Sequence, residues 1–125
     1  MTTALYVALF GAAGSLCRYF LSNAVQRFYG GRFPAGTMAV NVLGSLAIGV
    51  VISYFAARGT DSRLRVAMVA GFLGGFTTYS AFAWETWALL EQRTTGMATL
   101  YVVLTIGVCL LGCAAGVGIG RALAR

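Results

Sequence analysis

The chain has 125 residues, of which 59% are hydrophobic and only 10% are charged. A soluble domain carries about 25% charged residues, so the composition predicts one all-α domain, residues 1–125, embedded in the lipid bilayer. The net charge of +6 comes from nine arginines that are spread between apolar segments. Nucleic-acid binding requires a clustered basic face, and we do not expect it here.

The first predicted span, residues 4–25, is long enough to cross roughly 30 Å of hydrocarbon as a helix. We expect it to be retained rather than removed as a signal peptide, because it lacks a basic leading region. Arg18 lies in its last third. Two interpretations of Arg18 stay open: its side chain reaches back to the membrane interface, or its charge stands at the mouth of an anion pathway.

The second predicted span, residues 36–57, carries a polar stripe. Thr37, Asn41 and Ser45 recur at every fourth residue and therefore share one face of the helix. An amide in hydrocarbon is costly unless it is hydrogen-bonded, so Asn41 alone could simply link two helices. Three polar residues in line favour a pathway.

The third predicted span, residues 64–90, is too long for one straight crossing and contains the sequence GFLGGFTTYSAF. The adjacent Gly74 and Gly75 each weaken a helix by roughly 1 kcal/mol relative to alanine. The hydroxyls of Thr77 and Thr78 can bond to backbone carbonyls and bend it. We therefore expect a break near the middle of this span. Non-helical backbone in a membrane is tolerated only when buried in protein or lining a polar cavity, which indicates a pathway or an ion site.

Aromatic and acidic residues follow the expected break. Tyr79 and Phe82 are spaced to share a face if the helix resumes there. Glu85 lies between Trp84 and Trp87, and tryptophan is enriched at membrane interfaces. This favours an interfacial position for Glu85 over a position at the midplane.

The fourth predicted span, residues 98–120, has two lines of residues at helical spacing. Tyr101 and Thr105 begin a weakly polar line, for which helix contact and a pathway remain equal alternatives. The other line consists of small residues typical of close helix packing: Gly112, Gly116 and Gly120.

Four spans place both termini on one side of the membrane, together with the second loop. Arginine bias in short loops orients membrane proteins, and the bias here is weak. A chain of this kind can insert in either direction, which permits two copies to pair antiparallel. One side holds Arg58, Arg63, Arg65, Arg121 and Arg125, and the other holds Arg27, Arg32 and Arg93.

The chemistry of the residues argues against an enzyme. The chain has no histidine, paired acids, nucleophile–base set or phosphate-binding loop. The amide and hydroxyl donors suit a small dehydrated anion better than a cation, because a ring of carboxylates is missing. A proton-coupled multidrug exporter would need a carboxylate in the first span, which has none. A non-transporting assembly subunit would explain the glycine faces but not the polar stripe or the Gly-Gly break.

Three segments resemble motifs of the CrcB or Fluc family, the fluoride channels of bacteria. Residues Gly71 to Phe82 resemble the signature G-F-x-G-G-x-T-T-F-S-T-F. Residues Gly36 to Gly49, GTMAVNVLGSLAIG, resemble the second-helix motif G-T-x-x-V-N-x-x-G-x-x-x-x-G. Residues Gly11 to Tyr19, GAAGSLCRY, are similar to the first-helix motif G-x-x-G-x-x-x-R-[YF]. The three matches occur in the family's order.

The resemblance implies a passive channel that exports fluoride from the cytoplasm across the inner or plasma membrane. It also implies an antiparallel, dual-topology homodimer with two pores, and a sodium ion (Na+) at the dimer centre held by the backbone carbonyls of Gly74 and Thr77. The fluoride pathway that it implies consists of Arg18, Asn41, Thr78, Tyr79, Ser80, Phe82, Glu85, Tyr101 and Thr105.

Two residues depart from the family pattern. Tyr79 stands where the family has phenylalanine, and Ala81 stands where it has threonine. The hydroxyl of Tyr79 could donate to fluoride or could block a site at the ring edge, and both alternatives stay open.

Overall fold

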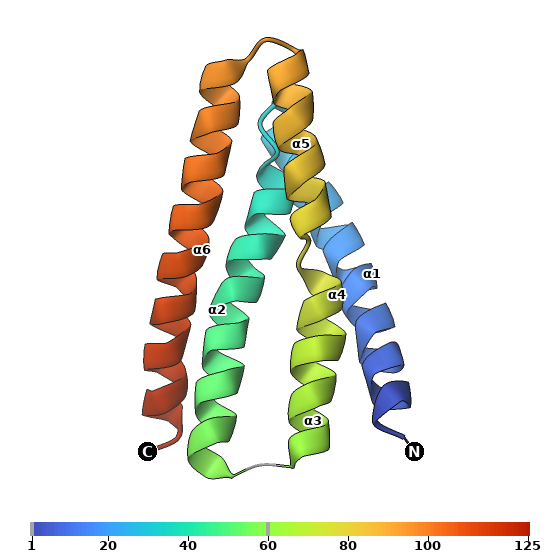
Figure 1. Cartoon of the computed structure of the whole chain (residues 1–125), viewed down its shortest axis with the longest axis vertical. Coiled ribbons are helices and arrows are strands. Elements are labelled where there is room, and N and C mark those ends of the chain that lie inside the picture. The colour runs from blue at the N-terminus through green and yellow to red at the C-terminus, as the bar shows by residue number, and fades with distance from the viewer. Residues whose placement is uncertain (1, 60) are drawn as a thin grey trace.

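The computed structural model describes residues 2–59 and 61–125, and it contains helices and connections but no strand within these ranges (Figure 1). The long helices are α1 (Thr3–Tyr29), α2 (Ala35–Arg58) and α6 (Thr95–Leu123). Between α2 and α6 lie α3 (Ser62–Val66), a π-helical segment (Ala67–Leu73), α4 (Gly74–Phe76) and α5 (Tyr79–Glu91).

Four helical stretches in the described part of the chain are long and apolar enough to cross a membrane. They are Thr3–Tyr29, Ala35–Arg58, Ser62–Glu91 and Thr95–Leu123. The prediction of an all-helical chain with four candidate membrane spans is confirmed. The helices extend past the predicted spans at both ends. Their lengths of 24 to 30 residues exceed the roughly 20 residues needed to cross hydrocarbon.

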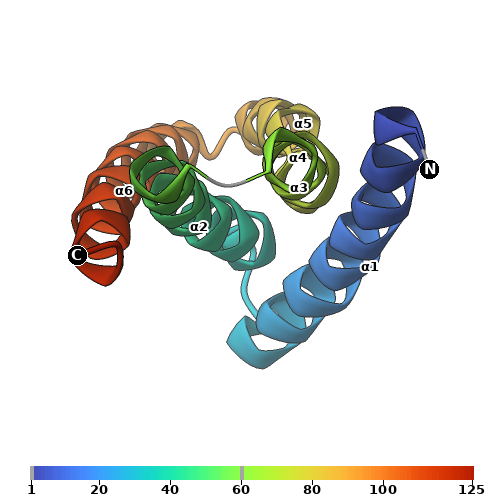
Figure 2. The ribbon, with the colours of Figure 1, turned by 90° about the horizontal axis from the view of Figure 1, so that it is seen from below.

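The spans run alternately up and down, so both termini lie at the same end as the connection between α2 and α3 (Figure 1). Helix α6 packs along α2, and α1 packs against the π-helical segment and α4. Seen along the bundle, α1 and α6 lie on opposite sides (Figure 2). Helix α2 therefore separates α6 from the α1 side of the bundle.

Glycine ends each of the first two helices. Gly30 and Gly59 have φ angles of 69° and 62°, a left-handed conformation that costs glycine little. The side chain of Gln26 then ties the connection together: its Nε2 donates to the Gly31 carbonyl at 2.9 Å, and its Oε1 accepts from the Gly36 N–H at 3.1 Å. The start of α2 is thereby fixed to the end of α1.

Small residues allow close contact on both sides of the bundle. Gly116 of α6 lies against the backbone of Leu46 in α2, and a Cβ at this position would overlap the Leu46 carbonyl oxygen. Gly14 of α1 lies in the same way against the carbonyl of Phe72. Small residues in membrane helices commonly serve this purpose. The glycine line expected in the fourth span thus faces α2.

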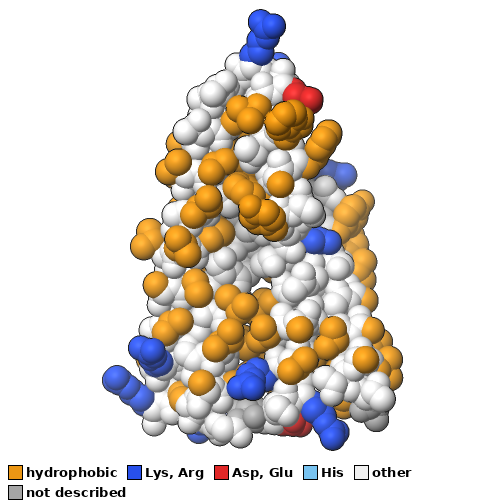
Figure 3. All heavy atoms as spheres, viewed as in Figure 1, with side chains coloured by type: hydrophobic (Ala, Val, Ile, Leu, Met, Phe, Trp, Pro, Cys, Tyr) orange, Lys and Arg blue, Asp and Glu red, His pale blue; other side chains and the backbone are white. Residues whose placement is uncertain are grey.

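The outer surface of the bundle is strongly apolar. Leu110 and Leu111 of α6 are 67% and 72% exposed. Figure 3 shows hydrophobic side chains over the middle of one face, with most of the visible arginines near its two ends. Such a surface is stable when lipid surrounds it, and the chain is a multi-pass membrane protein.

Exchanging Gly116 for alanine should destabilise the fold. The added methyl group would overlap the Leu46 carbonyl, and overpacking typically costs about 1–3 kcal/mol. Gly118→Ala is the matched control on the same helix, because no atom lies within 4 Å of its added Cβ. The measurement is the unfolding temperature in detergent, followed by size-exclusion chromatography after heating. Equal temperatures for the two variants would contradict the close approach of α2 and α6.

Candidate functional site

Helical geometry is interrupted between α4 and α5. Thr77 has φ −85° and ψ 160°, and Thr78 has φ −150° and ψ 113°, so both are extended. The Thr77 N–H still bonds to the Leu73 carbonyl at 3.0 Å. The Thr78 N–H does not continue this pattern, because it donates to a side chain of another span.

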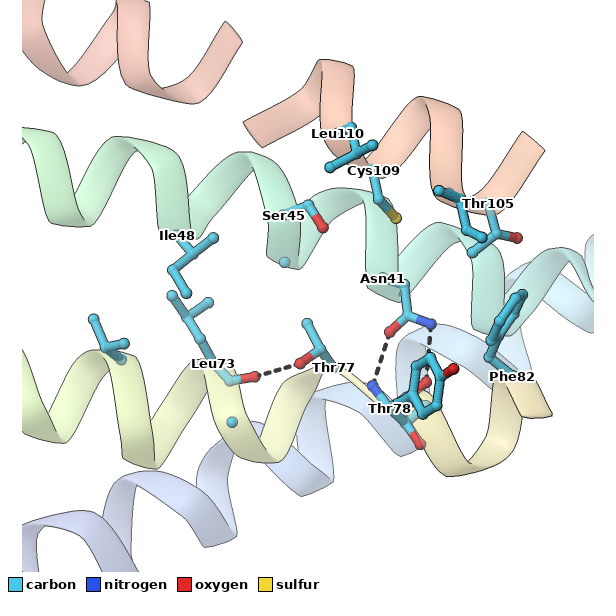
Figure 4. A pocket seen from close by; sticks show the side chains of 15 residues that line it. Asn41, Ser45, Ile48, Leu73, Thr77, Thr78, Phe82, Thr105, Cys109 and Leu110 are labelled. Atoms are coloured by element: carbon cyan, nitrogen blue, oxygen red, sulfur yellow. Dashed lines mark hydrogen bonds between the residues drawn. The ribbon is translucent and has the colours of Figure 1, made fainter. Parts of the chain in front are cut away.

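Asn41 of α2 supplies that side chain. Its Oδ1 accepts from the Thr78 N–H at 2.8 Å, and its Nδ2 donates to the Thr78 carbonyl at 3.0 Å (Figure 4). A side-chain amide offers both a donor and an acceptor, so it satisfies both backbone groups of one residue. The interrupted backbone is therefore bonded although it lies among membrane spans.

Arg18 of α1 reaches the same segment from the other side. Its Nη1 donates to the Thr77 carbonyl at 3.2 Å, and its side chain is half-buried. The guanidinium borders a hollow of about 870 Å³ that lies between α1, α2 and α5. The other polar residues that line this hollow are Ser15, Ser22, Asn23, Thr37, Thr78, Ser80 and Glu85.

Glu85 joins three spans through hydrogen bonds. Its Oε1 accepts from the hydroxyl of Thr37 in α2 at 2.7 Å, and its Oε2 accepts from the hydroxyl of Tyr101 in α6 at 2.7 Å. Thr37 and Tyr101 are buried, and Glu85 is half-buried. Bonds to a carboxylate are stronger than bonds between neutral groups. The carboxylate is thus held on both oxygens.

A second cavity of about 440 Å³ lies on the other side of the interruption, between α2, α6 and the third span (Figure 4). Tyr79 and Phe82 border it, with ring centroids 5.7 Å apart. Phe82 is buried and packs on Tyr101 with centroids 5.2 Å apart, whereas Tyr79 is 81% exposed. Asn41, Gly74, Thr77, Thr78 and Thr105 also line this cavity.

Thr78 lines both spaces. Its Oγ1 lies 3.3 Å from the Oγ of Ser80, and either hydroxyl can donate to the other. The Thr78 Oγ1 also accepts from the Ala81 N–H at 3.2 Å, which caps α5. The interruption therefore forms a hydroxyl-bearing wall between the two spaces.

The structure distributes the predicted site residues over these two spaces. Arg18, Ser80 and Glu85 border the 870 Å³ hollow. Tyr101 is linked to that hollow through Glu85. The hydroxyl of Thr105 is buried and has no hydrogen-bond partner among the described residues. The cavity of about 440 Å³ next to α6 is lined by Asn41, Tyr79, Phe82, Thr105, Gly74 and Thr77.

Sequence reasoning did not assign Ser15, Ser22 or Asn23 to the site, although all three border the hollow around Arg18. For Ser15 and Ser22 the signal was present in the spacing, because residues 15, 18 and 22 share one face of α1. Thr37 was part of the predicted stripe, but its bond to Glu85 could not be read from one helix alone.

Comparison with known proteins identifies the relatives of the chain. A family model described as CrcB-like protein, Camphor Resistance (CrcB), matches residues 5–117. The fluoride-specific ion channel FluC of Geobacter sulfurreducens is 44% identical over 125 residues, which cover 98% of this chain and 100% of that protein. The fluoride-specific ion channel FluC of Rhizobium leguminosarum bv. trifolii is 42% identical over 125 residues, covering 99% and 100%.

Replacing Asn41 by alanine should lower stability by about 2–6 kcal/mol, because two part-buried backbone groups each lose their partner at a cost of about 1–3 kcal/mol. Ser45→Ala is the matched control, since Ser45 lies one turn further on α2 and borders the same cavity. Thermal unfolding of both variants in detergent provides the comparison. A loss no greater for Asn41→Ala than for Ser45→Ala would contradict the assigned role of the amide.

Proposed function

The chain belongs to the CrcB family, and we propose that it is a fluoride-specific ion channel that lets fluoride leave the cytoplasm down its gradient. The proposal rests on full-length similarity to proteins named fluoride-specific ion channels. The structural observation that carries it is the Asn41–Thr78 pair, which holds non-helical backbone between two hollows. Export of this kind lowers fluoride toxicity and requires no enzymatic step.

The lining of the two spaces suits a small anion. Hydroxyl groups of Thr78 and Ser80 can donate hydrogen bonds to it, and the rings of Tyr79 and Phe82 present positively polarised edges. Both oxygens of Glu85 already accept hydroxyl donors, which reduces the repulsion that its charge exerts on an anion. Weak contacts of this kind allow an ion both to enter and to leave.

We further propose that two copies pair antiparallel in the inner or plasma membrane as a dual-topology homodimer. The weak arginine bias between the two ends permits both orientations. The exposed ring of Tyr79 and the opening of the cavity beside it support a surface that a second copy completes. The fluoride pathways would then be formed by residues of both chains.

The residues at the interruption also fit a sodium ion. The described residues contain no cluster of histidine, cysteine or acidic side chains that could hold a metal. The Gly74 carbonyl receives no hydrogen bond from them either, because the Thr78 N–H donates to Asn41 instead. Backbone carbonyls are the neutral oxygen ligands that hard cations accept. Gly74 and Thr77 would hold the ion, which would supply a fixed positive charge and a link between copies.

Liposomes containing the purified protein test the proposed function. Fluoride-loaded liposomes should release fluoride rapidly, as measured with a fluoride electrode, while chloride-loaded liposomes should retain chloride. Protein-free liposomes give the background leak. Absence of fluoride release from folded, dimeric protein, or equal release of chloride, would contradict a fluoride-specific channel.

Phe82→Ile should reduce fluoride release at least roughly tenfold, because isoleucine keeps the apolar volume but removes the polarised ring edge. Phe28→Ile is the control, since Phe28 lies near the end of α1 and is 96% exposed. Both variants are compared with the unaltered protein at equal reconstituted amounts. Wild-type release from Phe82→Ile would restrict Phe82 to a packing role.

A further inference from the structure

Helices α2 and α6 come together near the end of the bundle at which both of them finish. They run in the same direction (Figure 1). Gly120 of α6 lies so close to α2 that a Cβ at this position would overlap the Val50 carbonyl and the Ser53 hydroxyl. The last turns of the two helices are therefore placed relative to each other by direct contact, at a distance along the bundle from the two hollows described above.

Helical period decides which residues stand beside this contact. Successive residues of a helix turn by about 100°, and the sense of rotation is the same on two helices that run in parallel. Tyr54 and Arg58 therefore leave the contact face of α2 on one side. Ile119 and Leu123 of α6 leave it on the same side, and Arg121 leaves it on the opposite side. We call Tyr54, Arg58, Ile119 and Leu123 the Arg58 surface.

The guanidinium of Arg58 is held in place on this surface. It lies over the ring of Tyr54, 5.8 Å from the ring centroid, which is within the range of a cation–π contact. This contact uses a flat face of the guanidinium, whereas its N–H donors lie in the plane of the group. The three carboxylates of the chain accept hydrogen bonds from groups other than Arg58, namely Asp61, Glu85 and Glu91. The donors of Arg58 are thus available to an anion.

Part of the charge of Arg58 balances the end of its own helix. Arg58 is the last residue of α2, and a helix C-terminus carries about half of a negative elementary charge. About half of the positive charge therefore remains. The neighbouring residues of α6 are apolar and face outward, since Ile119 and Leu123 are 46% and 61% exposed. A cation with available donors thus stands at the border of an apolar surface.

We propose that the Arg58 surface binds the headgroup of an anionic phospholipid. The guanidinium donates to phosphate oxygens, for which its geometry is suited, and the acyl chains cover Ile119 and Leu123. Tyrosine suits this depth because its ring is apolar and its hydroxyl is polar. A phospholipid joins a phosphate to hydrocarbon and so matches both parts of the surface, whereas inorganic phosphate or an acidic protein segment matches only the charged part. Basic sites between membrane helices bind such headgroups.

Lipid-dependent stability tests the proposal without measuring transport. The full-length protein is heated in detergent at increasing phosphatidylglycerol, and the lipid concentration that gives half of the maximal rise in unfolding temperature is determined. It should increase at least roughly fivefold in Arg58→Gln, the factor that one arginine contributes near an anionic headgroup. Tyr54→Leu, which removes the ring under the guanidinium, should also increase it. Arg121→Gln is the matched control: it removes the same charge in the last turn of α6, on the opposite side of the contact, and should leave the value nearly unchanged.

The contrary results are distinct. Equal increases in Arg58→Gln and Arg121→Gln would reveal a general attraction to the basic end and overturn a defined site. An unchanged value in Arg58→Gln would restrict this arginine to balancing the end of α2. Absence of stabilisation by phosphatidylglycerol, or equal stabilisation by phosphatidylcholine, inorganic phosphate or polyglutamate, would contradict an anionic lipid as the occupant. Fluoride release is a separate measurement, and its outcome does not affect this inference.

A second measurement uses the unaltered sequence. The protein is labelled with ¹⁵N-arginine and placed in phosphatidylcholine bilayer discs that contain a small fraction of phosphatidylglycerol with a spin label at the start of one acyl chain. The signals of Arg58 and Arg121 are assigned by their loss in the two glutamine variants. The spin label should broaden the signal of Arg58 more than that of Arg121. Equal or weaker broadening of the Arg58 signal would overturn the proposal.

Discussion

The pair of hydrogen bonds between the Asn41 side chain and the Thr78 backbone is the interaction on which the site depends. A residue that leaves a helix inside a membrane loses both partners of its backbone, and each unsatisfied group costs about 1–3 kcal/mol. The side chain of Asn41, on α2, supplies new hydrogen-bond partners for both the N–H and the carbonyl of Thr78. The interruption is therefore a defined structure in which the N–H and the carbonyl of Thr78 are both hydrogen-bonded.

Helix α2 organises the bundle around this pair. One turn before Asn41, Thr37 donates to Glu85, which also accepts from Tyr101 of α6. The same polar stripe thus bonds the third span at two levels, while glycine contacts join α2 to α6. Val40, between the two stripe residues, is fully buried. A polar seam and close backbone packing together set the relative positions of α2, α6 and the third span.

The sequence predicted the four spans because hydrophobicity over about twenty residues carries that information locally. The stripe of Thr37 and Asn41 was also predictable, since helical period defines which residues share a face. Their partners were not, because period does not tell which span faces the stripe. Arg18 shows the limit most clearly: a long side chain can reach the interface or the interior, and only the contact of α1 with the third span directs it to the Thr77 carbonyl.

The π-helical segment Ala67–Leu73 had no signal in the sequence, and it adjoins the close contact of Gly14 with Phe72. The roles of Tyr79, Phe82 and Thr105 in permeation stay predictions. Sodium binding and dimer formation depend on an ion and a second copy of the chain. Local patterns describe one chain, and these properties belong to an assembly.

The hydroxyls of Thr78 and Ser80 can each act as the donor in their mutual bond. Rotation of a hydroxyl takes place within picoseconds to nanoseconds, far faster than movement of a helix. In the proposed channel, reorientation of these two protons would let an ion pass from one hydroxyl to the other while the backbone stays in place.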